Sequence, residues 1–351
     1  MKTTIITTLA FLTTFTFSKA QNSQRYTDDI FTDIEVTTDV QYGHNLKYND
    51  EPQDLLMDIY QPKDDIETAR PVIILVHGGS FVGGSKDGGD VKPLAEAFAK
   101  KGYVTASIEY RLGIKDKYTK PTKTEMSSAV MRGTQDARAA VRFFRKSFVE
   151  QGNPYGIDTA NIFMGGSSAG GFISLHLAYL DKDSEIPDYM DLNSASLQGG
   201  LEGNSGNPGY SSKVKAIINI SGAIGDVAWM ENNTTPVLSF HGDQDKTVPF
   251  GTGNISILIF KIMKIDGSAT IHQKADELGI ANMFVPEYGA GHVPHSKFPE
   301  YMDTTINDMT IFLANILSEG HEDVGVQSVR DTTQSSYHTS VNNEIYKREE
   351  Q

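Results

Sequence analysis

The chain has 351 residues, enough for one domain with a deep core or for two small domains, so length alone does not fix the number of domains. Its 31 Lys and Arg residues are outnumbered by 45 Asp and Glu residues, and the formal net charge of -14 argues against a nucleic-acid partner, because phosphate binding needs clustered positive charge. The sequence has no cysteine, which excludes disulfides, thiolate metal sites and cysteine catalysis.

The first 20 residues have the pattern of an export signal. Lys2 supplies a short positive region, residues 3–17 are uncharged, and residues 18–20 form a small-x-small cleavage site. We therefore predict a signal peptide over residues 1–20 and a secreted or periplasmic protein. An ordered N-terminal strand is the alternative, because many threonines weaken the apolar region. No later apolar stretch is long enough to cross a bilayer, so no transmembrane span is predicted.

Short runs rich in β-branched residues alternate with helical stretches from residue 71 to about residue 317. This alternation predicts an α/β fold with a mostly parallel sheet and helices on both faces. Residues 34–41 and 55–60 are expected to add an antiparallel edge. The predicted strands of the alternating part are residues 71–76, 103–110, 162–165, 214–220, 236–240 and 283–288, and the predicted helices are residues 91–101, 126–148, 169–180 and 299–317.

Two stretches do not follow this alternation. Residues 182–212 are rich in Asn, Gly and Ser, and we interpret them as an insertion above the functional site. Residues 318–351 are polar and lack the apolar surface needed for packing, so we predict a disordered tail or tether. The sequence therefore predicts one catalytic domain over residues 21–317, between the signal peptide and this tail.

The sequence Gly166-Ser167-Ser168-Ala169-Gly170 lies between a predicted buried strand and a predicted helix. A strand-to-helix turn this tight forces its central residue into a strained conformation and lifts the side chain out of the sheet, and the flanking glycines avoid clashes. Ser168 is therefore the candidate nucleophile. An ordinary flexible, glycine-rich turn is the alternative.

A serine nucleophile needs a histidine base and a group that holds this base in the right tautomer. Asp245 lies in a loop directly after a predicted strand, and His292 follows the last predicted strand. Ser168, Asp245 and His292 thus all come just after the carboxyl ends of strands, where open α/β sheets bind ligands. They are the candidate catalytic nucleophile, acid and base.

Three other residues compete for these roles. His295 is close enough in sequence to His292 to compete as the base. Asp243 lies in the same loop as Asp245, and Asp226 follows an earlier strand. Position after a strand end favours Asp245 and Asp226 over Asp243.

The loop His77-Gly78-Gly79-Ser80-Phe81 follows the predicted strand at residues 71–76. Acyl transfer builds negative charge on a carbonyl oxygen, and each fixed backbone N–H group stabilises that charge by about 3 kcal/mol. Glycines let the backbone approach a substrate closely. Gly79, Ser80 and Ala169 are therefore the candidate oxyanion-hole donors, with His77 as an orienter of the loop. A glycine-rich hairpin without a catalytic role is the alternative.

Together, in this order, these motifs resemble those of the α/β-hydrolase superfamily over roughly residues 50–317. The likeness is greatest to the carboxylesterase and lipase branch with a His-Gly-Gly-Gly loop, which includes hormone-sensitive-lipase-like enzymes and bacterial acetyl and feruloyl esterases. Ser80 stands where that branch usually has a third glycine. The resemblance implies the α/β-hydrolase fold, places the acid at Asp245 and implies a buried ion pair between Arg111 and Asp136.

We therefore predict a secreted serine ester hydrolase that acts through an acyl-enzyme and needs no cofactor. Its expected substrates are short-chain esters, carbohydrate-linked acetyl or feruloyl esters, or a polyester, with Trp229 as a candidate pocket residue. No metal-binding pattern is present. A serine peptidase of the prolyl-oligopeptidase type shares the fold and motif order and is the alternative, although the long extra domain of that family is absent. A non-catalytic secreted binding module is the third hypothesis.

Overall fold

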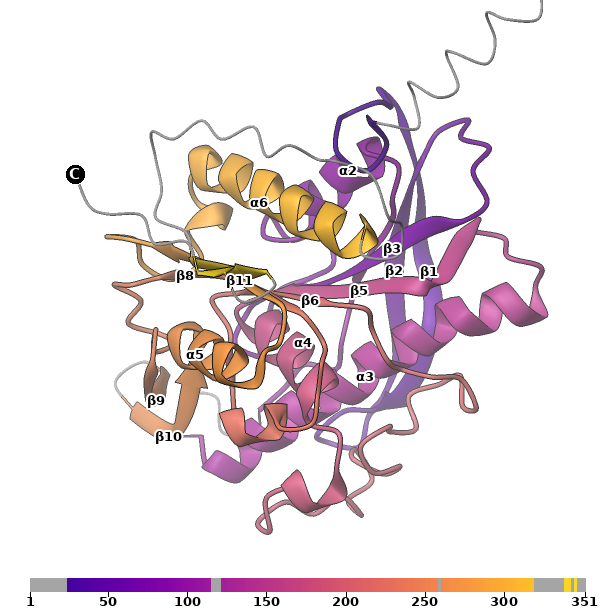
Figure 1. Ribbon diagram of the computed structural model, residues 1–351. Coiled ribbons are helices and arrows are strands. Elements are labelled where there is room, and N and C mark those ends of the chain that lie inside the picture. The colour runs from indigo at the N-terminus through magenta and orange to yellow at the C-terminus, as the bar shows by residue number, and fades with distance from the viewer. Residues whose placement is uncertain (1–23, 115–120, 258–259, 319–337, 342–343, 346–351) are drawn as a thin grey trace, which may run out of the picture.

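The computed structural model describes residues 24–114, 121–257, 260–318, 338–341 and 344–345. Within these residues one sheet runs through the middle of the molecule, with helices on both of its faces (Figure 1). The signal peptide predicted over residues 1–20 lies outside the described residues. In spatial order the strands of this sheet are β1 (Ile34–Leu46), β2 (Pro52–Pro62), β4 (Val104–Ile108), β3 (Arg70–Val76), β5 (Ile157–Ser167), β6 (Ile217–Ile220), β8 (Val237–Gly242), β11 (Asn282–Glu287), β12 (His338–Val341) and β13 (Glu344–Ile345).

The central strands run parallel to one another. Strand β3 pairs in parallel with β4 on one side and β5 on the other, and the parallel order continues through β6 and β8 to β11. Strands β1 and β2 extend one edge in antiparallel pairing. This arrangement confirms the predicted α/β fold with an antiparallel edge. It also collects the carboxyl ends of the parallel strands along one side of the sheet, where their loops can meet.

Helices cover both faces of the sheet, and each face has its own apolar core. In β3, Ile73 and Leu75 pack with α2 and α6, whereas Ile74 packs with α3 and α4 on the opposite face. A strand buried on both faces has a nearly continuous apolar sequence, which is why β3 was easy to predict. The helices are α2 (Lys92–Lys100) and α6 (Pro299–Ser318) on one face and α3 (Lys123–Glu150), α4 (Ala169–Tyr179) and α5 (Ser268–Leu278) on the other (Figure 1).

Helix α3 begins three residues before its predicted start. The Thr122 hydroxyl accepts a hydrogen bond from the Glu125 backbone N–H, and the Glu125 carboxylate accepts one from the Thr122 backbone N–H. This capping box satisfies two backbone donors that the helix would otherwise leave free. The extra turn carries Lys123, which lines the cavity beside the site.

A hairpin between β8 and α5 has no counterpart among the predicted elements. Its strands β9 (Thr252–Ile257) and β10 (Phe260–Gly267) pair antiparallel, and β7 (Ala223–Ile224) joins β10 to form a second, three-stranded sheet. The segment is rich in isoleucine, which favours strands, so its composition could have identified it. The hairpin lies next to α5 (Figure 1) and contributes one wall of the cavity described below.

The 182–212 segment is anchored alongside α3 and is not placed wholly above the site. Arg111 and Asp136 form a fully buried ion pair at 2.8 Å, as predicted, and Arg111 also donates to a backbone carbonyl of the segment. Arg138 and Arg142 of α3 donate to carbonyls farther along it. A segment without regular structure needs partners for its backbone, and guanidinium groups supply several donors each. Only the part that precedes these contacts reaches the cavity.

The tail contains two short strands. Strand β12 pairs antiparallel with β11, and β13 pairs with β12. Without β12, strand β11 would have an edge of unpaired backbone groups, and such an edge accepts a short extended segment readily. These two strands lie within residues 318–351, for which the sequence predicted a disordered tail or tether. The remainder of that prediction falls on residues 319–337, 342–343 and 346–351, outside the described ranges.

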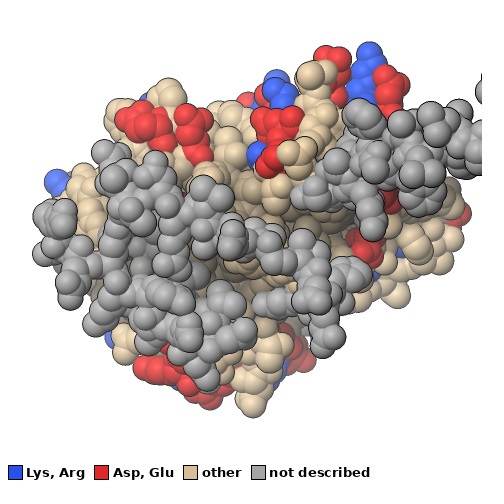
Figure 2. Space-filling view, turned by 45° about the horizontal axis from the view of Figure 1, so that its top comes forward, with Lys and Arg blue, Asp and Glu red and all other residues tan. Residues whose placement is uncertain are grey.

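The described surface agrees with the acidic composition. Groups of acidic side chains, with few basic ones between them, surround the uncovered part of the face shown in Figure 2. The absence of a nucleic-acid partner stays a prediction from charge. No helix within the described ranges is both long enough and apolar enough to cross a membrane.

Candidate active site

Ser168 lies in the turn between β5 and α4. Its backbone has φ 52° and ψ -113°, a conformation that costs a non-glycine residue on the order of 1–3 kcal/mol. The neighbouring glycines make this turn possible, because a Cβ on Gly166 would lie 2.2 Å from the Gly170 backbone, and one on Gly170 would lie 1.9 Å from the Val76 carbonyl oxygen. The strained turn expected from the sequence is therefore present.

The loops after β8 and β11 bring an acid and a base to this turn. The Ser168 Oγ atom lies 2.8 Å from Nε2 of His292, and Nδ1 of the same ring lies 2.6 Å from Oδ2 of Asp245. Because a carboxylate only accepts hydrogen bonds, Nδ1 carries the proton and donates it to Asp245. This leaves the Nε2 lone pair directed at the serine hydroxyl. The arrangement can remove the hydroxyl proton and so generate a nucleophile.

Asp245 is held as a carboxylate. Its side chain is fully buried, and its Oδ1 atom accepts hydrogen bonds from the backbone N–H groups of Thr247 at 2.8 Å and Val248 at 3.0 Å. Burial acts to raise the pKa of Asp245, but the hydrogen bonds from His241 and His292 outweigh it and hold the pKa well below its usual value. A charged carboxylate at this position stabilises the positive charge that His292 acquires when it takes a proton.

The competing residues point elsewhere. Asp226 accepts a hydrogen bond from the Ala228 backbone N–H and caps a short 3-10 helix, and Asp243 accepts one from the Gly289 N–H. His295 is buried, and its Nε2 atom lies 3.2 Å from the Asp90 carbonyl oxygen. Burial lowers the pKa of His295 to about 4, which keeps it neutral.

The loop after β3 has three consecutive residues with positive φ: Gly79 at 115°, Ser80 at 54° and Phe81 at 61°. A Cβ on Gly79 would lie 2.1 Å from the Gly83 carbonyl oxygen, so only glycine fits there. Ser80 occupies a left-handed conformation that favours glycine, the usual residue of the His-Gly-Gly-Gly pattern, and the structure gives no reason for a serine at this position. A small cavity of about 20 Å³ is bounded by Ser80 and Phe81 and by Ser168 with the residue after it.

Contacts beneath this loop hold it in place. Nδ1 of His77 lies 2.6 Å from the Gly78 carbonyl oxygen and donates to it, and the Gly78 backbone N–H donates to Asp90 at 2.7 Å. The His77 ring stacks on Tyr110 with centroids 4.5 Å apart. These contacts support the prediction that His77 orients the loop.

Backbone donors remain available around the small cavity. Among the described residues, none accepts a hydrogen bond from the backbone N–H of Gly79, Ser80 or Ala169. Ala169 is the first residue of α4, where a helix leaves its N–H groups unpaired. Of the three candidate oxyanion-hole donors, Ser80 and Ala169 line the small cavity beside Ser168.

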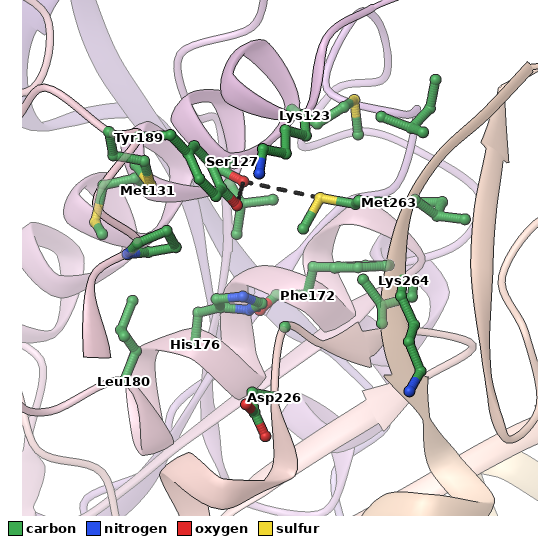
Figure 3. Close-up of a pocket in the computed structure, with 18 of the residues that line it drawn as sticks. Lys123, Ser127, Met131, Phe172, His176, Leu180, Tyr189, Asp226, Met263 and Lys264 are labelled. Atoms are coloured by element: carbon green, nitrogen blue, oxygen red, sulfur yellow. Dashed lines mark hydrogen bonds between the residues drawn. The ribbon is translucent and has the colours of Figure 1, made fainter. Parts of the chain in front are cut away.

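A larger cavity of about 510 Å³ adjoins the small one. The two share Met126, Phe172 and Ile255 as walls, so the larger cavity opens towards the serine. Its lining comes from α3, α4, the first part of the 182–212 segment and the β9–β10 hairpin (Figure 3), and is mostly apolar, with four methionines. Of the residues that form these walls, only Trp229 was predicted to line a pocket, since the others are far apart in the chain. The four methionines are Met126, Met131, Met190 and Met263.

Several polar or charged side chains also line the large cavity, and among them Lys123, Asp226 and Lys264 are exposed. The Ser127 hydroxyl lies 3.1 Å from the Tyr189 hydroxyl, and the Lys123 ammonium lies 4.0 Å from the centre of the Tyr189 ring (Figure 3). His176 donates from Nδ1 to the Phe172 carbonyl oxygen at 2.7 Å, and burial lowers its pKa to about 4. The apolar majority of the lining suits a largely apolar group, and charged side chains form part of the wall.

No cluster of three or more potential metal-ligating side chains occurs within the part of the chain that the structure describes. The single carboxylate of the site is occupied by hydrogen bonds from its own neighbours. The chemistry derived above uses side-chain and backbone groups of this chain.

Comparison with known proteins places these features in a wider group. The family model described as BD-FAE matches residues 57–234, about half of the 351 residues. Carboxylesterase 3B of Mus musculus is 33% identical over 147 residues, which are 40% of this chain and 24% of that protein. Gut esterase 1 of Caenorhabditis briggsae is 31% identical over 116 residues, which are 33% of this chain and 19% of that protein. The matched segments thus span a quarter or less of these relatives.

Solved structures share the fold over most of its length. A truncated carbohydrate esterase from gut microbiota superposes with a TM-score of 0.56 at 20% identity, covering 82% of this chain and 98% of that one. Esterase 2 of Thermogutta terrifontis, phosphorylated by paraoxon, superposes with a TM-score of 0.56 at 22% identity, covering 83% and 95%. At this level of identity the likeness establishes the α/β-hydrolase fold.

Proposed function

The chain belongs to the BD-FAE family, an esterase family, and from this premise we propose that it is a serine carboxylic ester hydrolase acting through an acyl-enzyme. The observation that carries the proposal is the continuous hydrogen-bonded series from Ser168 through His292 to Asp245. Its three members come from loops after three different strands, and it ends at a buried carboxylate. A purely structural role would not require a strained serine at its open end.

The proposed reaction proceeds in two halves. His292 takes the Ser168 proton as Oγ attacks the ester carbonyl carbon, and the carbonyl oxygen receives hydrogen bonds from Gly79, Ser80 and Ala169. His292 then gives its proton to the departing alcohol, which leaves an acyl group on Oγ. In the second half, His292 takes a proton from water, the hydroxide attacks the acyl carbon, and the proton returns to Oγ as the acid is released.

We propose that the substrates include esters with a large apolar acyl group as well as short-chain esters. A cavity of about 510 Å³ beside Ser168 is within the range of pockets that hold drug-sized groups and far exceeds the needs of an acetyl group. Its apolar lining suits an aromatic acyl group such as feruloyl. The predicted signal peptide supports a substrate outside the cytoplasm, and carbohydrate-linked esters meet both conditions.

The first test compares esters with amides. We expect the purified protein to hydrolyse p-nitrophenyl acetate and butyrate much faster than a peptide p-nitroanilide, since the family match and the His77-Gly78-Gly79-Ser80 loop both favour esters. Ser168→Ala measured in parallel gives the background rate. Faster anilide cleavage would favour the prolyl-oligopeptidase-type alternative. Absence of both activities from a folded protein would favour the binding module.

The second test concerns the large cavity. Ser127 lies on its wall, and Ser127→Trp introduces an indole into the space without altering Ser168 or its partners. We expect the rate on a feruloyl ester to fall by roughly tenfold or more relative to the rate on the acetyl ester, because steric exclusion from an apolar pocket is worth that much. Ser127→Ala, which removes only the hydroxyl, serves as the control. Equal loss on both esters would place the acyl group elsewhere.

A further inference from the structure

The fully buried His241 lies directly behind the proposed catalytic acid. It is in β8, and its Nε2 atom is 3.3 Å from Oδ2 of Asp245, the same oxygen that receives the hydrogen bond from His292. We propose, on the premise of the proposed function, that His241 is a positioning residue that fixes the orientation and charge of Asp245 by donating a hydrogen bond to it. It acts through Asp245 and does not touch the serine.

The partners of His241 determine which of its nitrogens carries the proton. Nε2 faces two acceptors, the Asp245 carboxylate at 3.3 Å and the Val248 carbonyl oxygen at 3.2 Å. Neither acceptor can donate, so Nε2 must be protonated. Nδ1 lies 2.8 Å from the Ser268 hydroxyl, which can donate to it. The environment therefore places a proton on Nε2, and with it a donor near the acid.

A buried series of hydrogen-bonded side chains behind Ser268 also favours donation from the Ser268 hydroxyl to Nδ1 of His241. The Asn219 side-chain amide donates to the Ser268 hydroxyl and to the Ser239 hydroxyl, both at 3.1 Å, and its oxygen accepts from the Gly222 backbone N–H at 2.9 Å. Because the amide supplies a donor to the Ser268 oxygen, the hydroxyl proton is free to point at His241. All the side chains in this series are fully buried, so water does not compete for these bonds.

Both carboxylate oxygens of Asp245 have polar partners. Oδ1 accepts from two backbone N–H groups, Oδ2 accepts from His292 on the open side, and Nε2 of His241 lies 3.3 Å from Oδ2 on the buried side. Without His241, Oδ2 keeps only the hydrogen bond from His292, so one donor fewer stabilises the negative charge of the carboxylate. The Phe250 ring packs against the edge of His241, with centroids 5.6 Å apart, and limits rotation of the imidazole.

Other charged and titratable groups around His292 are few. The Lys297 ammonium donates to the His292 carbonyl oxygen at 2.8 Å, and His295 follows in the same loop but is buried towards Asp90. These groups are the same in every variant proposed below. A change in pH dependence on altering His241 therefore reports on its link to Asp245.

Two substitutions separate the two contacts of His241. Glutamine can place an amide N–H near the position of Nε2 and keep the donor to Asp245, whereas asparagine reaches only the position of Nδ1 and keeps the contact with Ser268. We expect H241N to lower kcat on p-nitrophenyl butyrate by roughly 10- to 100-fold, the scale of outer partners that orient a functional side chain. H241Q should lower kcat by a smaller factor.

The pH profile is the measurement that a merely structural role would not change. When the donor is lost, the whole charge of Asp245 acts on protonated His292, so a higher pH is needed to free the base. In H241N the acid limb of the kcat profile should move up by roughly one pH unit, whereas in H241Q it should stay near the wild-type position. Equal midpoints in H241N and H241Q would overturn the proposal, whatever the change in kcat.

A third variant covers the case in which neither His241 substitution folds. Ser268→Ala leaves the ring in place but removes the hydroxyl that selects its tautomer, and it should move the acid limb in the same direction by a smaller amount. An acid limb of Ser268→Ala identical to that of the wild type would then contradict the proposal. Failure of the proposed function itself would be recognised separately, because the wild-type protein would show no esterase activity to profile.

Discussion

Ser168→Ala is expected to lower kcat for ester hydrolysis by about six orders of magnitude and to leave the fold intact. The hydroxyl is the only group of the site that can attack a carbonyl carbon, since His292 and Asp245 serve to take and stabilise its proton. Alanine keeps the Cβ and therefore the same strained backbone conformation, so the melting temperature should change little. Initial rates on p-nitrophenyl butyrate and a thermal melt measure the two effects.

The adjacent serine provides a matched control. Ser167 lies at the end of β5 with its side chain buried, and its hydroxyl has no hydrogen-bond partner among the described residues. Ser167→Ala should therefore keep nearly full activity. A fluorophosphonate should label the wild type and Ser167→Ala, at Ser168 in both, and should not label Ser168→Ala. Labelling of Ser167 in the wild type would contradict the assignment of the nucleophile.

The parts of the fold that were predictable are those whose burial dictates their sequence. Strand β3 is apolar along its whole length because both of its faces are covered, and the parallel order follows from its alternation with helices. The β9–β10 hairpin was missed although its composition favours strands, because it lies outside the strand–helix alternation. The position of the 182–212 segment was misjudged for another reason. Arginines on α3 fix it through its backbone carbonyls, which no side-chain pattern reveals.

The site, too, has parts that could be predicted from the sequence and parts that could not. Ser168, Asp245 and His292 could be proposed from local turns after strands, because a parallel sheet brings such turns together. The large cavity could not be predicted, since Ser127, Phe172 and Met263 meet only after α3, α4 and the hairpin have packed. The partner of His241 could not be predicted either. The contact of His241 with Asp245 depends on how tightly the loop after β8 turns back on the strand.

The second large effect on kcat is expected from a change of the proposed catalytic acid, Asp245. Asp245→Asn should lower kcat by about four orders of magnitude while KM changes little, because an amide in this position disfavours the tautomer of His292 that can accept the serine proton. Asp226→Asn and Asp243→Asn are the matched controls. Their carboxylates accept hydrogen bonds from the Ala228 and Gly289 backbone N–H groups, and an amide oxygen can do the same, so both variants should retain most of the activity.

Stability provides an independent check on Asp245. Its pKa in the folded protein lies below the ordinary value of 3.8, so its ionised form stabilises the fold above about pH 4, and this stabilisation is lost as the pH falls towards the folded-state value. Asp245→Asn lacks that contribution, so its unfolding free energy should differ most from that of the wild type near neutral pH, and the difference should shrink in acid. A severe loss of activity in Asp226→Asn, together with a folded and active Asp245→Asn, would instead place the acid after β6. The hydrogen bond from His292 to Asp245 would then have no catalytic role.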